Sequence, residues 1–251
     1  MGSLLRRAVV LLGLFGALAS PGMVLAAPQA APALSVDQIL AKFVQALGGK
    51  AALEKVTSRL TTGTLDAGEG RLYALEIREK APDKFLFIVL VEGQAAVKRG
   101  FDGAVGWEYS AQQGISQLSG ATLGAFKRSS QFYRWLRLKE LFRKLEAKGT
   151  SEVGDRTAYV VEATPEDGNP EILYFDTQTF LLLRRDIRAD LPDGSTVPLE
   201  TYYDDYRQVD GIKSAFSLRQ VRPDSVLILR YTQVRQNVPL DDAEFAKPAG
   251  P

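Results

Sequence analysis

The 251 residues include neither cysteine nor histidine. Without cysteine, the chain can form no disulfide, no thiolate nucleophile, no zinc–thiolate site and no iron–sulfur centre. Without histidine, it lacks the commonest metal ligand and the side chain that most often moves protons at neutral pH, so a Ser–His–Asp triad is impossible. We therefore expect no cofactor, no metal and no enzymatic activity.

The sequence also has almost no net charge. Thirty-one basic side chains face 30 acidic ones, for a formal charge of +1. This balance gives no overall attraction to nucleic acid. The acidic pairs Asp204–Asp205 and Asp241–Asp242 are the obvious candidates for carboxylate chemistry. Neighbours on a strand point to opposite faces of the sheet, so the two carboxylates of neither pair meet at one site. A carboxylate hydrolase is therefore a weaker hypothesis than the two binding functions described at the end of this section.

Long apolar runs are missing except near the start of the chain. Arg6 and Arg7 precede the apolar residues 8–18, and Val24–Leu25–Ala26 fits a signal-peptidase site. The apolar run is too short to span a bilayer, so we expect a signal peptide over residues 1–26, cut near Ala26. This predicts an exported, periplasmic protein that does not span a membrane, with a disordered linker over 27–34 and one domain over 35–248.

The remaining sequence predicts one helix followed by many strands. Ser35 and Gln38 stand in the relation of a capping box, and apolar residues then recur at helical spacing until Gly48–Gly49. A short helical turn follows over 50–55. Strands are expected over 58–66, 71–80, 85–91, 95–101, 105–109, 115–118, 159–163, 171–176, 180–190, 199–207, 212–222 and 226–236, with a short tail over 240–245. The turn spacing favours an antiparallel meander, counted as ten or eleven strands.

A helical segment is expected between the two groups of strands, over 119–148 with Gly149 as its end. Leu138, Leu141, Phe142 and Leu145 have helical spacing. Aromatic residues alternate here with lysines and arginines. One interpretation is a lid whose aromatic face covers a cavity and whose basic face meets a partner, and the other is an ordinary helix pair packed on the sheet with solvated basic residues.

Two features point to an apolar wall. Residues 85–91 are apolar at every position, which is typical of a strand that is buried on both faces. Asp102–Gly103 predicts a tight turn, after which Trp107 and Tyr109 point to the same side of a strand. The sequence leaves open whether these rings face the protein's own core or a ligand.

The motifs together resemble the lipoprotein-localisation family, LolA and LolB. The resemblance rests on residues 81–85 (Ala-Pro-Asp-Lys-Phe), on Phe101–Asp102–Gly103 followed by Trp107-x-Tyr109, and on the Tyr-Phe-Asp and Tyr-Arg-Gln-Val-Asp-Gly segments at 174–176 and 206–211. It implies a mainly β fold, an unclosed antiparallel β-barrel covered by short helices, whose concave face accepts acyl chains. The absent cysteine matches the soluble carrier of the family and departs from its lipoprotein receptor.

The leading hypothesis is a periplasmic, monomeric carrier that binds a lipid or a lipoprotein acyl chain. The alternative is a non-catalytic envelope protein-interaction module with a filled core, which docks on a protein partner through the basic helices around Arg134 and Arg137. For each ring singled out as a ligand contact, packing in the core is an equal alternative. The cavity candidates are Tyr73, Phe85, Phe87, Trp107, Tyr109, Phe126, Tyr133, Trp135 and Phe142.

Overall fold

The computed structural model of the protein describes residues 34–190 and 195–249. The predicted signal peptide and all but the last residue of the predicted linker lie outside these residues. The described residues belong to one compact unit. Within that part of the chain, no helix combines the length and the apolar character that a membrane span requires.

Helix α1 (Val36–Leu47) forms as its sequence predicts. The Ser35 side chain accepts a hydrogen bond from the Gln38 backbone, and the Gln38 side chain accepts one from the Ser35 backbone, so the capping box is complete. The apolar face of α1 is buried through Ile39, Leu40 and Phe43. A second short helix, α2 (Lys50–Glu54), follows.

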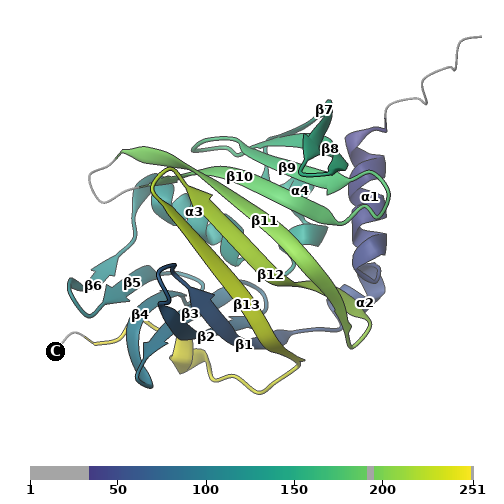
Figure 1. Ribbon diagram of the computed structural model, residues 1–251. Helices are drawn as coiled ribbons and strands as arrows, with labels where there is room; N and C mark the ends of the chain where they lie inside the picture. The colour runs from purple at the N-terminus through teal and green to yellow at the C-terminus, as the bar shows by residue number, and fades with distance from the viewer. Residues whose placement is uncertain (1–33, 191–194, 250–251) are drawn as a thin grey trace, which may run out of the picture. The chain divides into compact units, whose positions relative to one another are not determined.

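The described residues form one antiparallel sheet of thirteen strands, which run in the order β6-β5-β4-β3-β2-β1-β13-β12-β11-β10-β9-β8-β7 (Figure 1). Among the described strands, only the β1–β13 pair joins two that are far apart in the sequence. Strands β6 and β7 form the two edges, so the sheet is an unclosed half-barrel. The strands are β1 Ser58–Asp66, β2 Leu72–Lys80, β3 Lys84–Val91, β4 Gln94–Phe101, β5 Gly106–Ser110, β6 Gly114–Gln117, β7 Lys144–Val153, β8 Arg156–Thr164, β9 Glu171–Asp176, β10 Leu182–Asp190, β11 Thr196–Val209, β12 Ile212–Arg222 and β13 Ser225–Gln236.

The largest core lies between α1 and strands β8–β10. The apolar face of α1 packs against Val161, Leu173 and Phe175, and Leu138 and Phe142 complete the cluster. Leu138 belongs to α4 (Leu138–Leu141), which follows α3 (Gly120–Ser130) and the 3-10 turn η1 (Arg134–Leu136). One half of the concave face is therefore filled by α1 and α4.

The C-terminal segment covers the outer face of strands β2–β5. It contains the 3-10 turn η2 (Asp242–Phe245), which lies beside this part of the sheet in Figure 1. The Phe245 ring packs with Leu86, Ile88 and Trp107, and the Trp107 Nε1–H donates a hydrogen bond of 2.9 Å to the Phe245 carbonyl oxygen. Ion pairs from Arg78 to Glu244 and from lysines of β2 and β3 to Asp242 anchor the same segment.

The prediction of a helical segment that continues to Lys148 is wrong, because residues 144–153 form the edge strand β7. Lys144, Glu146 and Lys148 alternate with Leu145 and Ala147, and the three charged side chains form a row of ion pairs. This period of two is that of a strand. Gly149 has a φ of 88° and lies at a bulge within β7 instead of ending a helix.

Candidate functional site

The second half of the concave face is hollow. A cavity of about 1120 Å³ lies between the inner face of the sheet and the helical segment, with the α1 residues Phe43 and Leu47 at one side. Its volume slightly exceeds the range of roughly 300–1,000 Å³ that is usual for small-molecule sites. The sheet contributes lining residues from β1 to β6 and from β10 to β13.

Strand β3 shows how the sequence builds the wall. Phe85, Phe87 and Val89 line the cavity, whereas Leu86 and Ile88 pack under the C-terminal segment on the outer face. The expectation that this strand is buried on both faces is thus confirmed. The inner face of β3 borders the cavity, whereas its outer face is covered by the C-terminal segment.

Rings from the helical segment close the cavity from the other side. The Phe126 ring of α3 meets the Phe85 ring edge-on at 5.7 Å between centroids. The Trp135 ring of η1 meets Phe43 edge-on at 5.4 Å. Tyr133, which also lines the cavity, donates a 3.0 Å hydrogen bond to the Val56 carbonyl oxygen. These contacts fix the rings as part of the wall.

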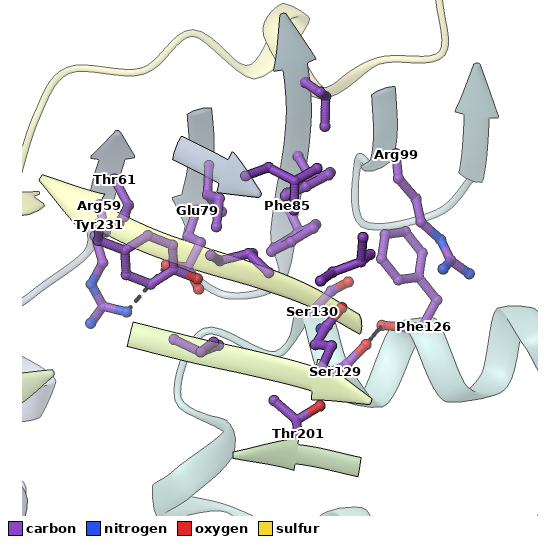
Figure 2. A pocket seen from close by; sticks show the side chains of 18 of the residues that line it. Arg59, Thr61, Glu79, Phe85, Arg99, Phe126, Ser129, Ser130, Thr201 and Tyr231 are labelled. Carbon is purple, nitrogen blue, oxygen red and sulfur yellow. Dashed lines mark hydrogen bonds and ion pairs between the residues drawn. The ribbon is translucent and has the colours of Figure 1, made fainter. Parts of the chain in front are cut away.

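Charged groups are also built into the wall (Figure 2). Arg59 and Glu79 form an ion pair of 3.2 Å beside Tyr231, and Arg99 lies over the Phe126 ring at 4.7 Å from its centroid. Burial is the largest influence on Tyr231 and raises the pKa of its hydroxyl, and the Glu79 charge adds to this rise.

Seven of the nine residues predicted from the sequence line the cavity, and two do not. The seven are Tyr73, Phe85, Phe87, Tyr109, Phe126, Tyr133 and Trp135. Tyr109 also packs against the outer cluster around Phe245, so it stands at the rim. Trp107 and Tyr109 do share a side of β5, as expected, but Trp107 is 1% exposed on the outer face and its assignment to the cavity is wrong. Phe142 was also misassigned, because it is buried in the core with α1.

Comparison with solved structures identifies the architecture. A DUF1329 family protein from Desulfovibrio piger superposes with a TM-score of 0.57 at 17% identity, over 84% of this chain and 97% of that chain. A LolA superfamily protein from Nitrosomonas europaea gives 0.56 at 13% identity, over 86% and 99%. A domain described as an outer membrane lipoprotein-sorting protein, from Vibrio parahaemolyticus, gives 0.53 at 14% identity, over 76% and 90%.

The fold is LolA-like. No protein-family profile matches the sequence, and no curated protein sequence matches it either. The likeness is therefore one of fold, and it confirms the half-barrel that the sequence motifs implied.

The LolA-like half-barrel contains a polar cluster that the sequence analysis missed. Glu171 of β9 is 3% exposed, and its Oε2 atom lies 2.6 Å from Arg134 Nη2 and 2.7 Å from Arg185 Nε. Burial acts to raise the pKa of Glu171, but the two arginine charges and their hydrogen bonds outweigh it and lower the pKa to about 2. Arg134 and Arg185 both line the cavity.

The rings of the helical segment agree with the lid interpretation, because Phe126, Tyr133 and Trp135 line the cavity, but several of its basic residues fit neither interpretation. Arg134 is buried in the cluster, and the Arg128 side chain is 12% exposed and bonds Asp167, so neither is a solvated surface charge. Arg137 bonds Glu140 and Gln131 within the segment. Several basic residues of this segment are therefore engaged in ion pairs and hydrogen bonds within the protein. This argues against a continuous basic surface that docks on a protein partner.

The acidic pairs have structural roles. Asp205 bonds Arg207, Asp241 caps η2, and Asp242 bonds Lys80 and Lys84. Among the described residues, no group of three or more acidic side chains is placed to hold a metal ion.

Proposed function

We propose that this protein is an exported carrier that holds the acyl chain of a lipid or lipoprotein in the hollow half of its concave face. One observation carries the proposal: the cavity of about 1120 Å³ is walled by rings such as Phe85, Phe87 and Trp135. Each methylene group moved from water into such a wall stabilises a complex by about 0.8 kcal/mol, so a long chain binds without any chemical step. Catalysis and cofactors have no part in this function.

The fold supports the proposal, because a LolA superfamily protein and a lipoprotein-sorting domain share it. The proposal includes the signal peptide over residues 1–26, a single domain over 35–248, a periplasmic location and a monomeric carrier. The alternative, an interaction module with a filled core, receives no support from a hollow concave face.

The two tryptophans of the chain provide an internal test. Trp135 lines the cavity, whereas Trp107 lies under the C-terminal segment on the other face. A brominated fatty acid quenches tryptophan fluorescence at short range. We expect quenching in the Trp107→Phe variant, which retains Trp135, and little quenching in Trp135→Phe, which retains Trp107.

The same purified protein should yield lipid on organic extraction after expression in the periplasm. Equal quenching of both variants would place the ligand outside the cavity. Absence of quenching together with absence of extracted lipid would overturn the carrier function.

A further inference from the structure

The polar cluster at the cavity wall contains more positive than negative charge. Arg134 and Arg185 share one oxygen of a single carboxylate, Glu171. Arg128 approaches the other oxygen only to 4.0 Å and is neutralised by Asp167 at 3.0 Å. The group of Arg134, Arg185 and Glu171 therefore has a net charge of +1 in a buried position. An uncompensated buried charge costs free energy, which an anion from outside the cluster would recover.

The protonation behaviour of the arginines agrees with this imbalance. Burial lowers the pKa of Arg134, and the charge of Arg185 lowers it further, against the opposing effect of Glu171. Burial also acts to lower the pKa of Arg185, but Glu171 and Tyr203 outweigh it and raise that pKa.

Two donors in the cavity lining lack acceptors among the described residues. The Nε atom of Arg134 and the Oγ atom of Ser130 are buried and have no hydrogen-bond partner among the described residues. Ser130 is 4% exposed and Arg134 is 5% exposed, and both line the cavity. Figure 2 shows Ser130 in the wall of the pocket. Buried donors without acceptors are uncommon in folded proteins, and they point to an acceptor supplied by a ligand.

The cavity lining as a whole repeats the imbalance. Its cationic side chains outnumber its acidic ones, which are Glu79 and Glu108. The cationic lining residues are Arg59, Lys98, Arg99, Arg134, Arg185, Lys213 and Arg222. This lining differs from the near-neutral chain as a whole, so the excess is local to the cavity.

We propose that Ser130, Arg134 and Arg185 bind the anionic headgroup, a carboxylate or a phosphate, of the amphipath whose chain fills the cavity. Guanidinium groups form strong, charge-assisted hydrogen bonds with both anions. The inference rests on the carrier function proposed above and adds to it the chemical class of the cargo.

Three probes of equal chain length test the inference: palmitate, cetyl phosphate and cetyl alcohol. Binding is measured by displacement of a fluorescent probe from the full domain. We expect at least one of the two anions to bind ten or more times more tightly than the alcohol, and the tighter anion identifies the headgroup. If the alcohol binds as tightly as both anions, the headgroup site is refuted while the carrier function stands. If none of the three binds, the carrier function itself fails.

Substitutions then locate the preference. Arg185→Gln leaves Glu171 with one arginine and makes the cluster neutral, so we expect the preference for the anion to fall about tenfold with the affinity for the alcohol unchanged. Arg230→Gln removes a positive charge from an exposed position outside the cavity and is the matched control. An unchanged preference in Arg185→Gln would overturn the assignment.

Ser130→Ala keeps the test valid if Arg185→Gln fails to fold, because the Ser130 hydroxyl has no partner among the described residues to lose. We expect Ser130→Ala to retain the thermal stability of the parent protein and to lose several-fold in affinity for the anion alone. Equal affinities of Ser130→Ala and the parent protein for the anion would count against the site.

Discussion

Gly100 illustrates how a single residue fixes the outer face of the half-barrel. A Cβ atom at this position would lie 2.4 to 2.6 Å from atoms of the Trp107 indole ring, so the absence of a side chain here makes room for the ring beside strand β4. The ring in turn reaches the Phe245 carbonyl. The position of the C-terminal segment thus depends on the absence of a side chain at Gly100, because that absence makes room for the Trp107 ring that bonds the segment.

We therefore predict that Gly100→Ala lowers the free energy of unfolding by about 1–3 kcal/mol, the usual cost of overpacking. Chemical denaturation of the variant and the parent protein measures this. A double-mutant cycle with Trp107→Phe supplies the control, because a smaller ring relieves the clash and the two changes should not add. Additive costs would mean that Trp107 is not the group that Gly100 accommodates.

Glu171 predicts a specific dependence of stability on pH. Its folded-state pKa of about 2 lies below the ordinary value of 4.5, so the stabilisation is complete above pH 4.5 and is lost as the pH falls toward 2. The shift corresponds to about 3 kcal/mol. The difference in unfolding free energy between the parent protein and Glu171→Gln should be largest near neutral pH and shrink through this window. A constant difference from pH 6 to pH 2 would contradict the assignment.

At the scale of the elements, the helix α1 and most strands could be predicted, because each follows one clear period. Strand β7 could not, because Leu138, Leu141, Phe142 and Leu145 fit a helix while Lys144, Glu146 and Lys148 fit a strand. Arg185 was missed for a related reason. A register shift between Leu182 and Arg184 breaks the alternation of β10, so its sequence does not show which arginine faces inward.

The C-terminal segment should stabilise the fold without contributing to the cavity. Phe245 has no exposed surface, so Phe245→Ala should cost about 3–5 kcal/mol of unfolding free energy. The segment lies on the outer face, and the variant should therefore bind a fatty acid as the parent protein does at temperatures where it is folded. Thermal denaturation and fluorescent-probe displacement measure the two effects. A loss of affinity in the folded variant would show that the outer face controls the cavity.

At the scale of the whole molecule, the half-barrel itself could be predicted, but the side of the wall on which each ring lies could not. Trp107 and Tyr109 share a face of β5, as alternation requires. The Trp107 ring lies on the outer face, where a segment 138 residues later in the chain covers it, and Tyr109 stands at the rim between this segment and the cavity. Alternation shows that the two rings share one side of β5, but it does not show whether that side borders the cavity or the C-terminal segment.

A bulky substitution inside the cavity should separate binding from stability. Leu218 of β12 lines the cavity, and Leu218→Trp adds volume to empty space instead of to packed core. We expect its affinity for a fatty acid to fall at least tenfold, while its unfolding free energy stays equal to that of the parent protein or rises through the added apolar burial. Displacement titration and chemical denaturation give the two quantities.

Val221→Trp is the matched control, since Val221 lies on the same strand and is not among the cavity-lining residues. It adds the same ring at a position from which the ring does not occlude the cavity, so its affinity should equal that of the parent protein. Equal affinities of Leu218→Trp and Val221→Trp would mean that ligand does not occupy the hollow. Destabilisation of Leu218→Trp by several kcal/mol would mean that the hollow is closed by packing in solution, because only a filled core resists an added ring in this way.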